Sequence, residues 1–336
     1  MFVRYRLAAV LALTCLQPFL FSPLNAADRP DRIIISGAAG QLGELTVKEL
    51  LRRGVDPRNL ILVSHTPQKL AAYAQMGATV RYGDLYKPET LDKVYAGGTR
   101  MLLISIGGPS PTSRPLAHKR GFDAAVRAGV RHIVYTSALG ADRGETPLAA
   151  EHLQSENYLK ASGARWTVLR NGFYADLNLS AAIDMAETGS AKVPANEPRT
   201  APVMRADCAA AAAGALLNPS VSENQTFDIT GPTLYNRRDV VEAVSTMTGK
   251  RIEVTEVGQQ PAGGAPGGTA PGGPAASDAP FVPLGPSAGT PAIISDAVAR
   301  LSGHPAMGLR AVLEANKKQI LAAASKTSSP AAKSAR

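Results

Sequence analysis

The sequence predicts an α/β protein built on a doubly wound parallel sheet, with a smaller C-terminal region on the substrate side. Short β-branched runs alternate with helical segments, a glycine-rich turn joins the first strand to the first helix, and polar residues follow several strands. With 336 residues, 45% of them hydrophobic, the chain is long enough to bury a sizeable core.

The expected strands are short apolar runs, and the expected helices carry apolar residues at helical spacing. In chain order the strands lie at 32–36, 60–64, 79–82, 100–106, 132–136, 166–170, 225–229 and 251–257. The helices lie at 41–53, 69–75, 88–95, 115–128, 149–162, 182–187, 207–217, 236–248, 293–301 and 307–323. This alternation of strand and helix indicates βαβ units.

The N-terminal segment is typical of a secretory signal peptide. Arg4 and Arg6 precede an apolar run, and Ala26 offers a small residue for cleavage, so residues 1–26 are expected to be removed. The apolar run is short for a membrane span. We therefore expect a periplasmic or secreted protein with no stable span. A cytoplasmic protein or an uncleaved N-terminal anchor is the alternative.

The remaining chain divides by composition. Residues 27–257 form the expected nucleotide-binding domain with its substrate-side elements. Residues 258–291 are rich in proline and glycine, and such a segment cannot bury enough apolar surface to offset its ordering entropy, so a disordered linker is predicted. Residues 292–324 follow as C-terminal helices, and residues 325–336 as a disordered tail.

Charge and cysteine content exclude several classes of function. Removal of residues 1–26, with two arginines and no acidic residue, lowers the formal net charge from +9 to +7. No run of basic residues with interleaved aromatics appears, so nucleic-acid binding is not expected. Cys208 is alone in the mature chain, which rules out an internal disulfide. A homodimer is left open.

The spacing of His152 and Glu156, four residues apart on an expected helix, is compatible with a metal pair. No third ligand accompanies them. We interpret the two side chains as a solvated helix face and expect no metal site.

The glycine turn after the first strand is the strongest functional signal. Gly37 permits a tight turn, Gly40 lets the backbone approach a pyrophosphate, and Gly43 lets the helix and strand pack closely. The free N–H groups of the following helix favour phosphate. This motif predicts a Rossmann-type NAD(P) site. Its cofactor-binding residues are Gly37, Ala38, Ala39, Gly40, Gln41, Leu42 and Gly43.

The end of the second strand bears on the choice between NAD and NADP. An acidic residue there would bind the ribose hydroxyls, but the chain has no carboxylate between Ser64 and Lys69. Ser64 and Lys69 can contact a 2′-phosphate, and His65 adds charge when protonated. NADPH is therefore favoured over NADH by a small margin. The alternative for Lys69 is a solvated lysine in a first helical turn.

Further polar residues follow the other strands, where ligands bind in parallel sheets. Asp84 comes after the third strand and is a candidate for the adenine edge, or a helix cap. The others are Ser105, Thr136, Ser137, Asn171 and Gly172.

Several of these segments together resemble the NmrA-like, atypical short-chain dehydrogenase/reductase family. The matching runs are Ile35-Ser-Gly-Ala-Ala-Gly-Gln-Leu-Gly43, Tyr135-Thr-Ser-Ala-Leu139, Leu169-Arg-Asn-Gly-Phe-Tyr174, Met204-Arg-Ala-Asp207 and Leu301-Ser-Gly-His-Pro305. The resemblance implies cofactor contacts at Gly37–Leu42, at His65, near Ser105 and at Asn171–Tyr174, which includes Phe173. It also implies hydride transfer from NAD(P)H to a quinone or a similar conjugated acceptor.

The sequence departs from the family in three respects. His65 stands where relatives have arginine, the proline- and glycine-rich stretch replaces a segment that walls the substrate pocket, and a signal peptide is unexpected. These departures put the NADP preference and the substrate in doubt. They leave open a second hypothesis, a non-catalytic NAD(P)-binding redox sensor or interaction protein.

The Tyr-x-x-x-Lys pair of ordinary short-chain dehydrogenases is absent, because Leu139 follows Tyr135 and Ser162 follows Tyr158 at that spacing. Quinone reduction does not need such a proton relay, since the cofactor carries the chemistry. Asn171 and Tyr174 are the catalytic candidates, as donors to the acceptor oxygen. The alternatives are a strand-end turn for Asn171 and a core-facing ring for Tyr174.

Overall fold

The computed structural model describes residues 31–107, 113–144, 146–258 and 291–326. The expected signal peptide, residues 259–290 of the expected linker, and residues 327–336 of the expected tail lie outside this part of the chain. Within it, no helix combines the length and apolar character needed to cross a membrane.

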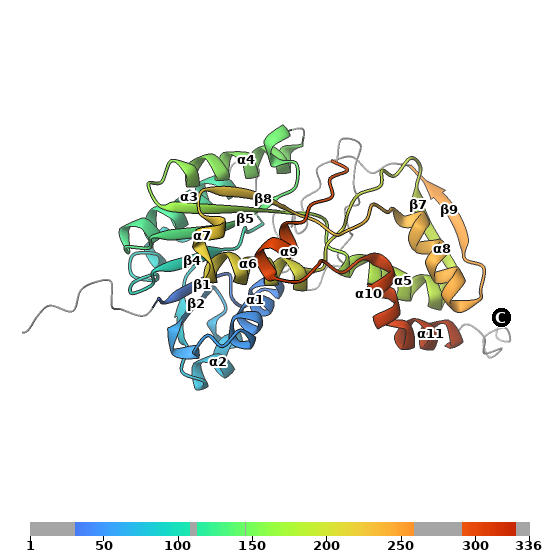
Figure 1. Cartoon of the computed structure of the whole chain (residues 1–336), viewed down its shortest axis with the longest axis horizontal. Coiled ribbons are helices and arrows are strands. Elements are labelled where there is room, and N and C mark those ends of the chain that lie inside the picture. Colours follow the sequence, from blue (N-terminus) through green and yellow to red (C-terminus); the bar gives the residue numbers. More distant parts are fainter. Residues whose placement is uncertain (1–30, 108–112, 145, 259–290, 327–336) are drawn as a thin grey trace, which may run out of the picture. The chain divides into compact units, whose positions relative to one another are not determined.

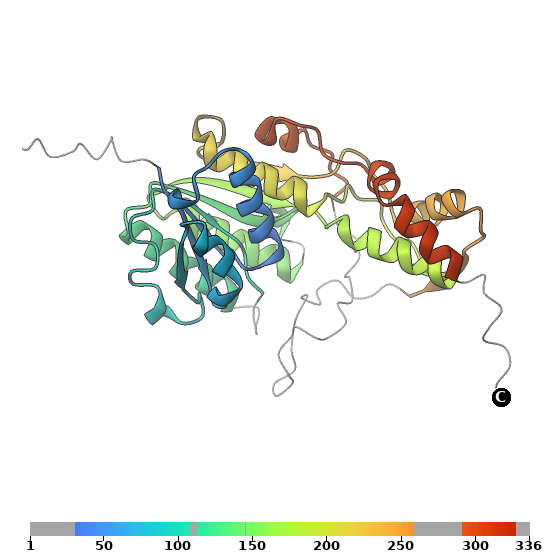
Figure 2. The same cartoon turned by 90° about the horizontal axis from the view of Figure 1, so that it is seen from below.

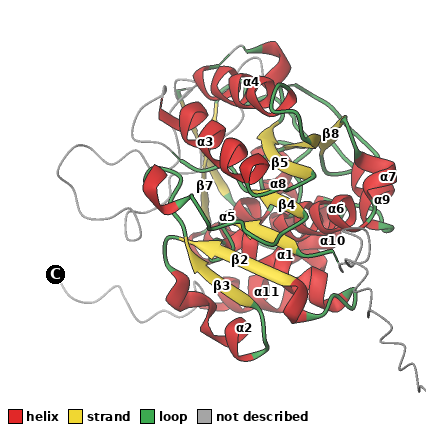
Figure 3. Ribbon diagram, turned by 90° about the vertical axis from the view of Figure 1, so that its left-hand side faces the viewer, coloured by secondary structure: helices red, strands yellow, loops and turns green. Residues whose placement is uncertain are grey.

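Seven parallel strands form the main sheet in the order β3-β2-β1-β4-β5-β6-β8 (Figure 3). They are β1 (Ile33–Ser36), β2 (Leu60–Ser64), β3 (Thr79–Tyr82), β4 (Arg100–Leu103), β5 (His132–Ala138), β6 (Arg165–Asn171) and β8 (Gln225–Ile229). In register, Ile35 lies between Leu62 of β2 and Leu102 of β4. The order reverses between β1 and β4, which confirms the doubly wound fold class and creates a crevice-forming switch point there.

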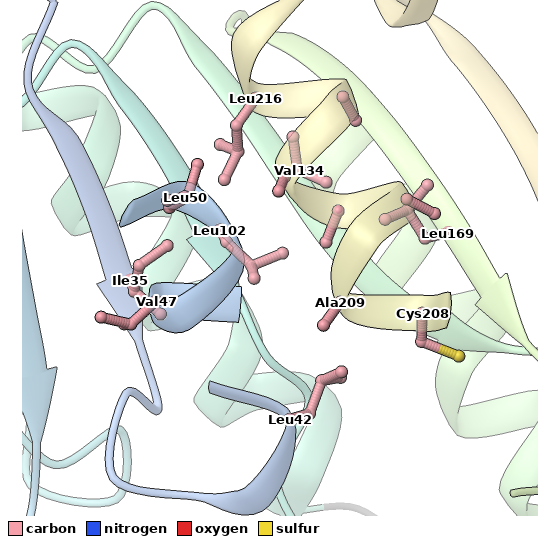
Figure 4. Close-up of a cluster of buried hydrophobic side chains, with 14 of the residues drawn as sticks. Ile35, Leu42, Val47, Leu50, Leu102, Val134, Leu169, Cys208, Ala209 and Leu216 are labelled. Atoms are coloured by element: carbon pink, nitrogen blue, oxygen red, sulfur yellow. The ribbon is translucent and has the colours of Figure 1, made fainter. Parts of the chain in front are cut away.

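Helices cover both faces of this sheet, because side chains alternate along each buried strand. One face packs against α1 (Gln41–Arg52), α6 (Arg205–Leu217) and α9 (Ala297–Ser302). Figure 4 shows Val47 and Leu50 of α1, and Leu216 of α6, meeting Ile35 and Leu102 of the strands. The other face packs against α3 (Ser113–Arg127) and α4 (Pro147–Lys160). The remaining short helices are α2 (Ala71–Gln75), α7 (Pro219–Ser222), and the 3₁₀ turns η2 (Pro57–Asn59), η3 (Pro67–Leu70), η4 (Pro88–Thr90) and η5 (Ala141–Arg143).

The smaller region has a core of its own. Its parallel pair β7–β9 consists of β7 (Ser190–Pro194) and β9 (Glu253–Val257). Its helices are α5 (Asp176–Thr188), α8 (Arg237–Thr248), α10 (Leu309–Ala315) and α11 (Lys317–Lys326). Met185, Val244 and Ile320 belong to its buried cluster, and Figures 1 and 2 show the red helices α10 and α11 beside α5.

The C-terminal segment returns to the main sheet through α9. A Cβ atom added to Gly214 of α6 would lie 1.8 Å from the carbonyl oxygen of Leu301, so glycine is needed for this close approach. At the first turn of α6, the Asp207 carboxylate accepts a hydrogen bond of 2.8 Å from the Met307 N–H. Two of the sequence runs shared with the NmrA-like family therefore meet in space.

Several predicted elements were wrong in extent. The helix expected at 88–95 is only the η4 turn. The Thr90 hydroxyl accepts from the Asp84 N–H, and the Asp84 carboxylate accepts from the Tyr86 N–H, so side chains satisfy the backbone that leads into the expected helix. Leu91, Val94 and Tyr95 still pack on the core with the helical spacing that misled the prediction.

In the smaller region, α5 begins at Asp176 rather than 182, and β7 was not predicted. The helix expected at 293–301 is reduced to α9, since the Ser295 N–H is held by the Thr230 hydroxyl instead. The helix expected at 307–323 is divided at Asn316 into α10 and α11.

Candidate functional site

The glycine turn is shaped by two demands on its backbone, at Gly37 and at Gly43. Gly37 has φ of +93°, which favours glycine. A Cβ atom on Gly43 would lie 2.2 Å from the Gly37 carbonyl oxygen, so helix α1 can approach the turn only with glycine there. At Gly40, an added Cβ would meet nothing closer than 3.4 Å, and the residue is exposed.

The first turn of α1 has no side-chain cap. Gly40 is its N-cap and no side chain caps it, whereas the N–H groups of Gly37 and Ala38 are held by the Val63 carbonyl. Ala39 is partly exposed and Gln41 is exposed, while Leu42 packs into the core. An uncapped first turn beside an exposed glycine fits a pyrophosphate.

The residues after β2 form a short loop next to this turn. The Ser64 hydroxyl is buried and accepts a 2.9 Å hydrogen bond from the Thr66 N–H, so it shapes the loop. His65 and Lys69 are both exposed. Asp84, after β3, accepts from the Tyr86 N–H in the local turn described above, and the N-cap of η4 is Lys87 instead.

Ser105 and Thr136 lie together where β4 and β5 end. The Ser105 N–H donates to the Thr136 hydroxyl at 2.8 Å, and that hydroxyl lies 3.2 Å from the Ser105 hydroxyl. Thr136 is buried and Ser105 is only partly so. Of the two, Ser105 is the one that a ligand can reach.

Ser137 faces away from this pair. Its hydroxyl donates to Glu156 at 2.7 Å, and Glu156 receives two further hydrogen bonds, of 2.9 and 2.8 Å, from Arg170. The Arg170 and Ser137 hydrogen bonds lower the pKa of Glu156 against the opposing effect of burial. Ser137 is therefore tied into the buried Glu156–Arg170 ion pair, and Arg170 also lies 3.1 Å from the exposed Asp142.

Asn171 and Tyr174 lie close together after β6. Asn171 is buried, and its Oδ1 atom has no hydrogen-bond partner within the described part of the chain. Burial raises the pKa of the Tyr174 hydroxyl above its usual range, against a smaller lowering from the Asn171 side chain. The Arg205 guanidinium lies 4.4 Å from the centre of the Tyr174 ring. Tyr174 is thus a neutral phenol held by a stacked cation.

Gly172 and Phe173 hold the backbone between these two side chains. The Gly172 N–H donates to the Ile229 carbonyl, and the Phe173 carbonyl accepts from Val203. A Cβ atom at Gly172 would lie 3.3 Å from the Ile229 oxygen, which explains the small residue.

Sequence reasoning missed a buried polar cluster behind the end of β4. Tyr135 of β5 lies between His118 of α3 and His152 of α4, with its hydroxyl 3.1 Å and 3.0 Å from their Nδ1 atoms.

The interpretation of His152 and Glu156 as a solvated face was wrong, because their side chains are buried, at 6% and 0% exposed. The available signal was the set His152, Ser155 and Glu156 at positions i, i+3 and i+4, which share one helix face.

In the residues described, no three histidine, cysteine or carboxylate side chains form a group that could hold an ion.

Comparison with known proteins identifies the cofactor class as NAD(P)H. Residues 37–219 match the model of an NAD(P)H-binding family. The chain is 32% identical over 223 residues to quinone oxidoreductase 2 of Escherichia coli strain K12, which covers 66% of this chain and 76% of that protein.

Solved structures agree. The crystal structure of the E. coli NADPH-dependent quinone oxidoreductase in complex with NADPH is 29% identical, with a TM-score of 0.70 over 84% of this chain and 99% of that one. Triphenylmethane reductase of Citrobacter sp., complexed with NADP(H), is also 29% identical, with a TM-score of 0.64 over 68% and 79%. The chain therefore belongs to the NmrA-like family of NAD(P)H-dependent oxidoreductases.

Proposed function

We propose that this protein uses NADPH to reduce a quinone or a similar flat, conjugated acceptor. The observation that carries the proposal is the Tyr174 phenol, which keeps its proton and lies beside the unpartnered Oδ1 of Asn171. Both lie at the carboxyl edge of the sheet that holds the glycine turn. Two relatives that resemble the chain reduce quinones or dyes by name and bind NADP(H) in their crystals.

The glycine turn is proposed to hold the pyrophosphate at the first turn of α1, after Gly40, because the N–H groups of Gly37, Ala38 and Gly40 already donate to carbonyls of the protein. His65 and Lys69 are exposed at the end of β2, in the place where this fold receives the ribose 2′-phosphate. Neither is a carboxylate, which supports NADPH over NADH. Ser105 is the proposed contact at the end of β4. The bound nicotinamide would supply the hydride, and the residues of the chain would bind and orient the reactants.

Asn171 and Tyr174 are the proposed groups at the reacting end. A buried carboxamide oxygen without a donor costs about 1–3 kcal/mol, so a ligand N–H or O–H at Asn171 Oδ1 would recover that energy. Tyr174 keeps its proton because of its raised pKa. Its hydroxyl can therefore donate to an acceptor oxygen on which negative charge develops.

Steady-state oxidation of NADPH and NADH, with 1,4-benzoquinone and menadione as acceptors, tests this function. We expect turnover with NADPH. The Tyr174→Phe variant should lower kcat/KM by about tenfold or more, as expected for the loss of a hydrogen bond to developing charge. Asn171→Ala should lower it as well, because a ligand N–H or O–H loses its acceptor at Oδ1. Tyr158→Phe, a tyrosine whose hydroxyl accepts from Gln154 on the outer face of α4, is the matched control.

Two results would contradict the proposal in different ways. Tight NADPH binding by calorimetry without turnover of any acceptor would favour the non-catalytic sensor or interaction protein. Turnover that is equal in the parent, Tyr174→Phe and Asn171→Ala would keep the oxidoreductase but remove these two residues from its chemistry.

A further inference from the structure

The four residues that follow β4 are held by four different parts of the protein. The segment Ile104–Gly107 leaves the sheet next to β1, at the switch point of the strand order. Three of its N–H groups donate anchoring hydrogen bonds: Ile104 to the Ser36 carbonyl, Ser105 to the Thr136 hydroxyl and Ile106 to His118 Nε2. The Gly107 carbonyl accepts a fourth hydrogen bond from the Tyr86 hydroxyl. The Ile104 side chain is also the nearest neighbour of Gly37. The segment therefore lies against the glycine turn and its position is set from several sides.

Of these anchors, His118 is the one contributed by a fully buried ionisable side chain. The Ile106 N–H donates to its Nε2 atom at 3.0 Å, so Nε2 carries no hydrogen. Its Nδ1 lies 2.9 Å from the Ser155 hydroxyl, which itself donates to the Glu151 carbonyl. Nδ1 must therefore be the protonated nitrogen. These contacts fit a single tautomer of neutral His118.

The rest of the cluster is compatible with the same tautomer. Tyr135 Oη lies 3.1 Å from His118 Nδ1, where it can share the Nδ1–H with Ser155, and 3.0 Å from His152 Nδ1, to which it can donate its own hydrogen. Burial, and then the charge of Arg114, keep the pKa of His152 low, at about 3; the pKa of His118 is lowered by burial, His152 and Arg114. The charged groups around the cluster are Arg114, Glu151 and Glu156.

We propose that His118 is a positioning residue for cofactor binding: through the Ile106 N–H it holds the Ile104–Gly107 segment against the nicotinamide-cofactor site. The inference rests on the proposed function, because it assumes that the cofactor lies along this segment. Loss of the Nε2 acceptor would leave a backbone N–H unpaired and release one anchor. The cofactor would then bind a segment that is no longer held in place, at a cost in affinity.

The test compares His118→Leu, which removes the acceptor, with His118→Gln, whose Oε1 can stand near the former Nε2 position. NADPH dissociation constants measured by calorimetry should rise about tenfold for His118→Leu. The value for His118→Gln should return to within about threefold of the parent. His132→Leu is the matched control, because His132 is equally buried in β5 but bonds Thr167 at the other end of the strand. It should lower thermal stability and leave NADPH affinity within about twofold.

Equal NADPH affinity in His118→Leu and the parent would overturn the proposal. An equal loss of affinity in His132→Leu would overturn it as well, because the effect would then come from general destabilisation. If His118→Leu does not fold, amide hydrogen exchange at Ile106 decides the question in the parent and in His118→Gln. We expect slow exchange in both, and fast exchange in the parent would refute the anchor.

The exchange measurement also separates the two proposals. A parent protein that binds no NADPH, yet shows a slowly exchanging Ile106 amide, would refute the proposed function and leave only a structural role for His118. A parent that binds NADPH with a freely exchanging Ile106 amide would refute the positioning role alone.

Discussion

Three buried neutral histidines should make this protein lose stability on mild acidification. His118, His132 and His152 are at most 6% exposed. The Thr167 hydroxyl donates to the Ser222 carbonyl, so it must accept from His132 Nε2–H, and the other ring nitrogen has no hydrogen-bond partner in the described residues. Burial, then Arg100 and Arg165, lower the pKa of His132 to about 4.

The size of the effect follows from linkage. Since the folded-state pKa of each ring lies below the unfolded value of about 6.5, the folded protein binds fewer protons, and its stability is fully present above that value. It falls as the pH drops toward the folded-state pKa values. At pH 5.5 each ring costs about 1.4 kcal/mol, and the three together about 4 kcal/mol. The free energy of unfolding of a folded domain is typically only about 5–15 kcal/mol, so this loss is a large part of it.

Urea unfolding at pH 5.5, 6.5 and 7.5 measures this loss. His132→Gln keeps an amide donor for Thr167 and removes one titrating ring, so the drop between pH 7.5 and 5.5 should shrink by about 1.4 kcal/mol, roughly a third. The difference between variant and parent cancels the contributions of carboxylates such as Glu151 and Asp228. His65→Gln, at an exposed histidine, is the matched control for the substitution itself.

Parallel stability curves for the parent and His132→Gln would refute the reasoning. They would mean that water reaches the ring in the folded state, or that the unfolded state keeps it equally uncharged. A drop that shrinks equally in His65→Gln would show that exposed histidines, rather than burial, set the pH dependence.

Four further outcomes are expected. Gly43→Ala should weaken NADPH binding by about tenfold or more in calorimetry, since its Cβ would lie 2.2 Å from the Gly37 oxygen; unchanged affinity would mean that the turn can move. His65→Arg should tighten NADPH binding relative to NADH, because arginine adds a permanent charge in a fork geometry; an unchanged ratio would place the 2′-phosphate elsewhere. Glu156→Gln should lower the free energy of unfolding in urea by about 3 kcal/mol, as Arg170 loses its buried carboxylate; a loss below about 1 kcal/mol would show that Asp142 suffices. We also propose cleavage before Ala27, and N-terminal sequencing of protein from fractionated cells should begin there; an intact Met1 in the cytoplasm would contradict export.

The sequence by itself determined the sheet and the cofactor turn. Gly37, Gly40 and Gly43 act within one strand–turn–helix unit, so their spacing carries the geometry that local backbone sterics impose. The buried β-branched runs likewise gave strand positions to within a few residues. The segment at 88–95, wrongly expected to be a helix, contains the buried residues Leu91, Val94 and Tyr95 at helical spacing, because burial and not helix formation set that pattern.

The tertiary structure alone decided which polar side chains face the site. Ser137 is the next residue after Thr136 on β5, yet its side chain points to Glu156. Neighbouring residues of a strand face opposite sides of the sheet, and α4 covers the side that Ser137 faces. His118 and Tyr135 are 17 residues apart, and only the packing of α3 on β5 brings them together. Such contacts depend on long-range packing of whole elements, and no local spacing in the chain records that information.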